Sequence, residues 1–421
     1  MKKNPAIGIV SLGCPRNLVD SEAVVGRLHR KGYQIVDIKD ARVAIVNTCA
    51  FIDDAKKESI DMLLDLVALK KEGKLKKIIA YGCLVQRYKK MLVKEFPEID
   101  AFVGRISLNH TAHNFTLTPA HYTYLKICEG CLNNCSYCVI PKIKQRFRSL
   151  DVASVLCKTR QADSRRVSEV NIIGQDITGF GTDLVPKVSL TSLLKKILAQ
   201  TRHIKWFRLL YLYPSRITDE LLALIRQEPR ICKYIDVPIQ HVNDRILRAM
   251  NRHVSKKDIC LLLDKIRKAL PNAVLRTSVI VGFPSETEKE FKELLRFIRA
   301  FGFERLGAFM YSREEDTPAY ALPGQVSVKT KQDRFNEVMA CQQKISEALN
   351  KKFLGKTLDV LIDEQEGNSY LGRTQYDAPE VDGVVYVCSK KRLRCGEFVK
   401  ARIYDTLEYD LVGEALDEHC Q

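Results

Sequence analysis

The sequence predicts an α/β protein in three parts: an amino-terminal parallel α/β domain, a central partial (β/α)6 barrel and a small carboxy-terminal antiparallel β-barrel. Two observations lead to this prediction. Short apolar runs alternate with amphipathic stretches over most of the chain, as expected for strand and helix units that build parallel sheets. Beyond Gly355 the pattern changes to short β-rich runs separated by turn residues. We expect the parts at residues 1–104, 122–352 and 353–421, with a linker at 105–121.

In the amino-terminal part, three predicted strands each end close to a cysteine. The strands are 7–12, 43–47 and 77–81, and the cysteines are Cys14, Cys49 and Cys83. Helices such as 53–71 return the chain between them. Because the carboxyl ends of parallel strands share one edge of a sheet, we expect the three thiols to be neighbours and to form a metal-cluster site. The alternative is that they pack as small apolar side chains.

The linker has no strong periodicity and contains His110 and His113. We expect these histidines to be solvated loop residues instead of metal ligands.

Six strands are predicted in the central part, each followed by a helix: 122–127, 169–173, 206–213, 234–238, 274–281 and 305–310. The functional face of such a barrel lies at the carboxyl ends of its strands. The residues expected there are a cysteine-rich loop and then Gly174-Gln175-Asp176, Tyr213-Pro214, Gln240-His241, Gly282-Phe283-Pro284 and Tyr311-Ser312. Any one of these residues could instead have only a structural role, in forming the turn after its strand.

The cysteine-rich loop follows the first strand of the barrel. Cys131, Cys135 and Cys138 have the spacing C-x3-C-x2-C, which lets one loop supply three thiolates to a compact centre. A four-iron four-sulfur cluster held by three thiolates keeps one iron open for a small molecule, and an open position distinguishes a reactive centre from a structural one. The alternatives are a zinc knuckle, or a closed electron-transfer cluster that also uses Cys128.

The closing helix of the barrel is predicted at 333–352. The strands predicted after it are 358–362, 370–374, 383–387, 398–404 and 410–414, as in a small five-stranded barrel. The acidic stretch 377–383 is expected to be an exposed turn, which serves either recognition or solubility.

Charge is unevenly distributed along the chain. The formal net charge is +17, yet residues 353–421 contain 8 Lys and Arg against 14 Asp and Glu, a net of −6, so that the preceding residues carry +23. The body could therefore lie against a phosphate backbone, whereas the acidic tail is unsuited to one.

The amino-acid composition predicts a soluble globular protein with cysteines that bind metal. The chain of 421 residues is 46% hydrophobic and 28% charged, which is typical of a soluble globular protein. No apolar run approaches the roughly 18 residues of a membrane span. The apolar stretch near the start is short and Pro15 follows it at once, which favours a strand over an export signal. Fourteen clustered cysteines in such a chain favour metal ligation in a reducing cytoplasm over disulfides.

Several motifs together resemble those of the radical S-adenosylmethionine methylthiotransferases. The cysteine loop of a six-unit barrel is typical of radical S-adenosylmethionine enzymes, and three cysteines on an amino-terminal domain with a terminal TRAM-like barrel narrow the likeness. The motifs of the branch that modifies an aspartate of small-subunit ribosomal protein twelve stand at 11–22, 234–241, 281–284, 311–315 and 377–383. The resemblance covers essentially the whole chain. Cys128, Gln145 and Ser285 depart from the family pattern.

The resemblance implies a mechanism and its cofactors. Cys131, Cys135 and Cys138 would hold one four-iron four-sulfur cluster that binds S-adenosyl-L-methionine and cleaves it to a deoxyadenosyl radical. Cys14, Cys49 and Cys83 would hold a second such cluster that supplies sulfur to the β-carbon of the target aspartate. By position, Gly174 and Gln175 are candidates for contacting the amino acid end of the cofactor. Cys128 is not expected to be a ligand.

The expected partners are the ribosomal protein, free or on its subunit, and an electron-donor protein, with no membrane. The alternative enzyme is one that methylthiolates a tRNA adenosine, which would be expected to have a basic terminal barrel. An iron-sulfur relay protein without catalysis is the alternative from another class, and it would hold two fully ligated clusters.

Overall fold

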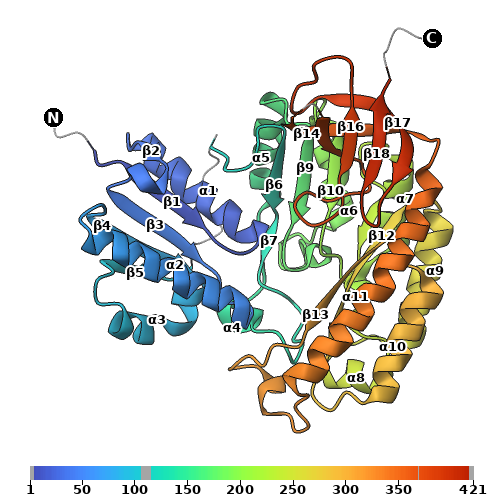
Figure 1. Ribbon diagram of the computed structural model, residues 1–421, viewed down its shortest axis with the longest axis horizontal. Coiled ribbons are helices and arrows are strands. Elements are labelled where there is room, and N and C mark those ends of the chain that lie inside the picture. The colour runs from blue at the N-terminus through green and yellow to red at the C-terminus, as the bar shows by residue number, and fades with distance from the viewer. Residues whose placement is uncertain (1–3, 106–114, 368, 417–421) are drawn as a thin grey trace.

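A computed structural model describes residues 4–105, 115–367 and 369–416, and its three parts are visible in Figure 1. The blue amino-terminal domain lies beside the green to orange barrel, and the red terminal barrel packs on the far end of that barrel. Residues 106–114 of the expected linker, including His110 and His113, lie outside the described residues, whereas its last residue, His121, is buried and its ring nitrogen lies 2.8 Å from Asp363 instead of being solvated. No helix among the described residues is long and apolar enough to cross a membrane.

The amino-terminal domain is a parallel sheet of order β2-β1-β3-β4-β5 flanked by helices. Its elements are β1 (Ile7–Ser11), α1 (Pro15–Arg30), β2 (Ile35–Val36), β3 (Val43–Thr48), α2 (Asp53–Lys71), β4 (Lys77–Gly82), α3 (Cys83–Glu95) and β5 (Ala101–Val103). The three strands predicted from sequence are β1, β3 and β4, which are adjacent in the sheet. The edge strands β2 and β5 are too short to be recognised by alternation.

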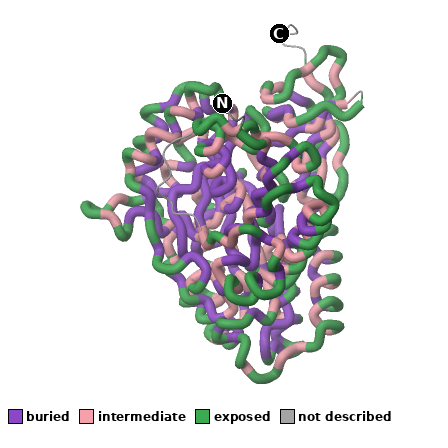
Figure 2. The backbone as a smooth tube through the Cα atoms, turned by 90° about the vertical axis from the view of Figure 1, so that its left-hand side faces the viewer, coloured by how far each residue is buried: buried purple, intermediate pink, exposed green. Residues whose placement is uncertain are grey.

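Six parallel strands form the central partial barrel. They are β6 (Tyr122–Lys126), β9 (Glu169–Ile173), β10 (Trp206–Leu209), β11 (Tyr234–Asp236), β12 (Val274–Val281) and β13 (Arg305–Met310). They form two three-stranded sheets, joined by a parallel bridge between Phe207 and Ile231. Apolar side chains between strands and outer helices form the largest core cluster, and Figure 2 shows the buried backbone running through the interior with exposed segments around it.

The helices outside the strands complete the barrel. They are α5 (Val152–Ser164), α6 (Leu190–Gln200), α7 (Asp219–Gln227), α8 (Asp244–Ala249), α9 (Lys256–Ala269), α10 (Glu288–Phe301) and α11 (Val328–Asn350). The short helix α4 (Ile140–Lys144) instead packs against the amino-terminal domain through Ile143. A two-stranded ribbon, β7 (Cys128–Glu129) with β8 (Arg148–Ser149), brackets the cysteine loop. The closing helix α11 begins five residues before its predicted start, because Ser327 caps it by accepting a bond from the Thr330 N–H.

The terminal part is a closed five-stranded barrel of order β14-β15-β16-β18-β17. Its strands are β14 (Thr357–Glu366), β15 (Ser369–Arg373), β16 (Val385–Cys388), β17 (Phe398–Thr406) and β18 (Leu411–Ala415). Four of its pairings are antiparallel, and β16 with β18 is parallel.

The terminal barrel closes the amino-terminal end of the central one. Tyr234, at the start of β11, donates to Asp382 at 2.6 Å, and Arg305, at the start of β13, pairs with Asp377 at 2.6 Å. Glu169 of β9 accepts from Arg373 of β15 at 2.6 Å. The mouth lies at the other end of the strands, and the eight residues of β12 span about 26 Å.

The prediction that 377–383 forms an exposed turn was wrong for its two aspartates, whereas Glu380 and Val381 are exposed. Asp377 is 2% exposed and the Asp382 side chain is 3% exposed. Glu380 has an exposed position, yet it accepts a hydrogen bond from the Tyr122 hydroxyl at 2.9 Å. The two aspartates pair with arginines at the floor of the central barrel, Asp377 with Arg305 and Asp382 with Arg276. The composition of the segment could not predict this burial, because a turn that forms ion pairs with another domain and a turn exposed to solvent can be equally acidic.

Candidate active site

Three chain segments meet at the carboxyl edge of the amino-terminal sheet: the loop before α1 with Cys14, the loop after β3 with Cys49, and the start of α3 with Cys83. Asn17, in the first turn of α1, joins these segments. Its side-chain amide donates to the carbonyls of Leu12 at 3.1 Å and Thr48 at 3.4 Å, and its oxygen accepts from the Cys83 thiol at 3.7 Å. The edge therefore brings the three cysteines together, as the strand order predicts.

Two glycines allow the cysteines this close approach. Gly13 has a φ of +83°, and a Cβ there would lie 2.8 Å from the Cys49 sulfur. Gly82 has a φ of +103°, and a Cβ there would lie 2.7 Å from the carbonyl of Thr48. A larger residue at either position would both strain the backbone and push the loops apart.

Arg16 connects the first cysteine set with the mouth of the central barrel. Its Nε donates to the Cys14 sulfur at 3.4 Å, and its Nη1 donates to the Gly174 carbonyl, after β9, at 3.2 Å. The guanidinium lies 4.6 Å from the ring centroid of Tyr211, after β10. Its charge also acts on Cys49 and Cys138. The partly buried Arg16 guanidinium therefore lies between the two cysteine sets.

Burial and charge set the protonation of these thiols. Burial alone would raise the pKa of Cys14, but the charge and hydrogen bond of Arg16 outweigh it and lower the pKa below its ordinary value. Burial raises the pKa of Cys49, and it raises the pKa of Cys83 to about 12. Iron binding at these thiols would therefore release protons.

The barrel cysteine loop is fixed by its neighbours. Asn133 donates to the Cys131 sulfur from its side chain at 3.3 Å and from its backbone at 3.4 Å. Arg252 donates to the Cys135 sulfur at 3.9 Å. Ser136 donates to the Ala249 carbonyl at 2.7 Å, which ties the loop to α8. Burial raises the pKa of Cys138 to about 12.

The Cys128 side chain packs against the backbone that follows β9. Its sulfur donates to the Asp176 carbonyl at 3.5 Å and lies 2.4 Å from where a Cβ of Gly174 would stand. Burial raises its pKa well above the ordinary range. This position suits packing better than ligation.

Gly174 and Gln175 follow β9 and lie at the mouth, as predicted. They differ in whether their oxygen atoms are available to a ligand. The Gly174 carbonyl is occupied by Arg16. The Gln175 side-chain oxygen is buried and has no hydrogen-bond partner among the residues that the structure describes, so Gln175 is the better placed of the two to contact a polar ligand. The Tyr213 hydroxyl, after β10, is likewise buried and unpartnered.

His241 and the residues around it form a structural network. His241 is fully buried, its Nδ1 accepts from the Asn243 N–H at 2.9 Å, and its Nε2 lies 3.2 Å from Glu286. Arg334 of α11 pairs with Glu286 at 2.9 Å. The network fixes the loops after β11 and β12, and both ring nitrogens of His241 are engaged in it.

Two buried ionic clusters clamp the amino-terminal domain to the barrel. In one, Lys144 of α4 pairs with Glu129 at 2.8 Å and with Asp20 of α1 at 3.5 Å. In the other, Glu314 accepts from Arg87 of α3 at 2.9 Å and from Lys56 of α2 at 3.1 Å. Since each cluster bridges both domains, together they fix the orientation in which the cysteine sets face each other.

The donor set fits iron-sulfur clusters better than single metal ions. Among the described residues, no group of three His, Cys, Asp or Glu side chains converges on one metal position. Thiolates of a four-iron cluster bind different irons and need not converge. Amide and guanidinium groups donate to the sulfurs of Cys14, Cys131 and Cys135, and hydrogen bonds to sulfur stabilise such clusters.

Sequence reasoning missed the residues that hold the cysteines in place. Arg16 and Asn17 stand directly after Cys14-Pro15, so their proximity to a ligand candidate was a usable signal. Glu314 stands in the 311–315 motif, but its role in docking could not be read from it, and Arg252 carries no signal, because only the folded chain brings it to the site.

Three sequence families match consecutive parts of the chain. Residues 6–104 match the uncharacterized protein family UPF0004, residues 125–298 the radical SAM superfamily and residues 354–416 the TRAM domain.

Curated relatives match along the whole length. The chain is 46% identical to ribosomal protein uS12 methylthiotransferase RimO of Clostridioides difficile, with 98% of this chain and 99% of the relative covered. It is 42% identical to the RimO protein of Geobacter sulfurreducens, with 97% and 98% covered.

Solved structures share the fold at low identity. The radical S-adenosylmethionine methyltransferase TsrM of Kitasatospora setae, with cobalamin and a [4Fe-4S] cluster bound, aligns with a TM-score of 0.52 at 12% identity over 75% of this chain and 77% of that one. The cobalamin-dependent enzyme OxsB aligns with a TM-score of 0.51 at 11% identity, over 82% and 56%.

Proposed function

Because the chain belongs to the family of ribosomal protein uS12 methylthiotransferases, we propose that it attaches a methylthio group to an aspartate β-carbon of ribosomal protein uS12 by radical S-adenosylmethionine chemistry. The observation that carries this proposal is the full-length identity of 46% to such an enzyme. The facing arrangement of the two cysteine sets around Arg16 supports it.

The six cysteines would form two separate cluster sites. Cys131, Cys135 and Cys138 would hold one four-iron cluster, and Cys14, Cys49 and Cys83 would hold another. When bound, these groups supply the electron that cleaves S-adenosylmethionine and the sulfur that is transferred. Gly174 and Gln175 would contact the cofactor, with the Gln175 oxygen as the free acceptor.

The protein orients the thiolates and limits the access of water to the site. Asn17 and Asn133 orient the thiolates, and Arg16 fixes the spacing between the two sets. The terminal barrel seals the floor and so limits the access of water to the mouth from below. We expect an electron-donor protein to reduce the clusters, and a location in the cytoplasm. We also propose that the functional domains end at residues 104 and 352, with the linker ending at residue 121.

Mass spectrometry after anaerobic reaction with reconstituted enzyme tests the proposal. Ribosomal protein uS12, but not tRNA, should gain the mass of one SCH2 unit. Cys49→Ala should abolish the gain yet still allow cleavage of S-adenosylmethionine, whereas Cys135→Ala should abolish both. A gain on tRNA alone would establish the alternative substrate, and a gain on neither would refute methylthiolation.

A further inference from the structure

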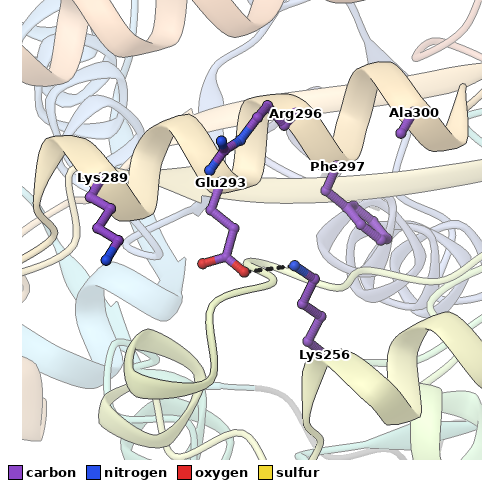
Figure 3. A pocket seen from close by; sticks show the side chains of 6 residues that line it. All are labelled: Lys256, Lys289, Glu293, Arg296, Phe297 and Ala300. Carbon is purple, nitrogen blue, oxygen red and sulfur yellow. Dashed lines mark hydrogen bonds and ion pairs between the residues drawn. The ribbon is translucent and has the colours of Figure 1, made fainter.

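A basic hollow lies on the outside of the barrel at the level of its mouth. It has a volume of about 510 Å³ and is lined by Lys256, Lys289, Glu293, Arg296, Phe297 and Ala300 (Figure 3). Lys256 is the first residue of α9 and Lys289 the second of α10. Because helices after parallel strands begin at the carboxyl ends of those strands, both cations stand on the same face as the cysteine loop.

The carboxylates of this region are already engaged. Glu293 pairs with Lys256 at 2.7 Å, as the dashed line in Figure 3 shows. Glu290 caps α10 through Thr287 and pairs with Arg245 at 2.6 Å, and Asp258 caps α9 through Ser255. Each of these three carboxylates therefore has a partner within the fold.

Three cations of α10 are not neutralised. Lys289, Arg296 and Arg299 are exposed and have no ion pair within the described part of the chain. Lys289 and Arg296 are seven residues apart, so they lie on the same face of the helix with about 10.5 Å between them along its axis. The outer face of α10, from its start at the mouth toward the floor, therefore presents unpaired positive charge outward.

The chemistry of this surface suits an extended polyanion better than a small anion. The Glu293 carboxylate lines the hollow, and it would repel an anion enclosed there. A phosphate backbone lying across α10 would instead meet Lys289 and Arg296 from outside, with counterion release as the driving force. The tail is unsuited to this role, since it is acidic and lies at the other end of the barrel.

We propose that the α10 rim, Lys289 with Arg296, binds the RNA backbone of the small ribosomal subunit while the mouth engages the ribosomal protein. This rests on the proposed function, and it makes the assembled subunit, with its RNA, the favoured substrate over the free protein. The contact reads the phosphate backbone and carries no base specificity.

Binding of the reconstituted full-length enzyme to small subunits as a function of salt tests this proposal. Lys289→Gln with Arg296→Gln removes two charges, so the slope of log K against log salt should become less steep by about 1.4–1.8. Between 50 and 200 mM salt the parent should then lose about ten times more affinity than the variant. Lys76→Gln with Lys77→Gln, which removes two exposed charges at the far edge of the amino-terminal sheet, is the matched control and should keep the parental slope.

Activity separates this inference from the proposed function. The ratio of modification of uS12 in subunits to modification of free uS12 should fall in the rim variant and stay constant in the control. Equal slopes for the rim variant and the control would overturn the RNA contact, whatever the activity. A parent enzyme that modifies uS12 in neither form would instead refute the proposed function and leave the binding slopes as an independent result.

Discussion

Replacing Glu169 with glutamine should loosen the terminal barrel from the floor of the central one. The Glu169 carboxylate is fully buried and bridges two buried arginines, accepting from Arg208 at 2.8 Å and from Arg373 at 2.6 Å. Removing one partner of a buried ionic group costs about 3–5 kcal/mol, because the remaining charge stays desolvated. Arg373 keeps its two bonds to Asp363, at 2.7 and 2.9 Å, so we expect the lower end, about 3 kcal/mol.

The single tryptophan of the chain reports on this interface. Trp206 packs edge-on against Phe398 of the terminal barrel, with ring centroids 4.7 Å apart. Its fluorescence during urea unfolding should therefore follow the separation of the two barrels. With a denaturant slope of about 3 kcal/mol/M, the loss should lower the midpoint of this transition by about 1 M.

An exposed ion pair provides the control for this experiment. Lys195 and Glu220 lie 2.9 Å apart and are more than half exposed, so Glu220→Gln should cost less than about 1 kcal/mol. If Glu169→Gln and Glu220→Gln shift the Trp206 transition equally, the buried bridge does not hold the barrels together and the reasoning is refuted.

Three further predictions concern the sites themselves. Asn17→Ala should reduce the iron bound by a Cys131→Ala, Cys135→Ala, Cys138→Ala protein, because it releases three loops at once, and unchanged iron content would contradict that role. Gly174→Ala should lower the unfolding temperature through its contact with the Cys128 sulfur, and adding Cys128→Ala should restore most of the loss. Burial raises the pKa of Glu22 to about 7, so its contribution to stability is full below about pH 4.5 and is lost as pH rises through 7. Over that interval the parent should therefore lose up to about 3 kcal/mol relative to Glu22→Gln in denaturant titrations, and parallel pH profiles would argue against a buried protonated carboxyl.

The parts of the fold that follow from periodicity could be predicted from sequence. Helix 53–71 and strands 169–173, 274–281 and 305–310 have the predicted bounds, because each has a regular apolar pattern and clear ends. The strand β10 is shorter than predicted, since after Leu209 the chain leaves the sheet to form the mouth. The separation of β1, β3 and β4 by similar helices was enough to predict that three distant cysteines meet.

The contacts between domains could not be predicted in this way. The acidic turn around Asp382 carries the composition of a solvated loop, and only its arginine and tyrosine partners on other elements make it an anchor. Arg87 and Glu314 are 227 residues apart, and neither has a local pattern that indicates burial. Such pairings depend on how whole domains dock, and this information is not present in any short stretch of the chain.

The closed floor has a consequence for how the protein is made. The strands that carry Glu169, Arg208 and Tyr234 are synthesised long before Asp382 and Arg373. The polar groups of these strands therefore lack their partners until about the last sixth of the chain has been made. A premature stop before that point would leave these groups exposed at the base of an unfinished enzyme. We therefore expect chains shortened at the carboxyl terminus to be degraded as misfolded products, instead of surviving as catalysts that lack only an accessory module.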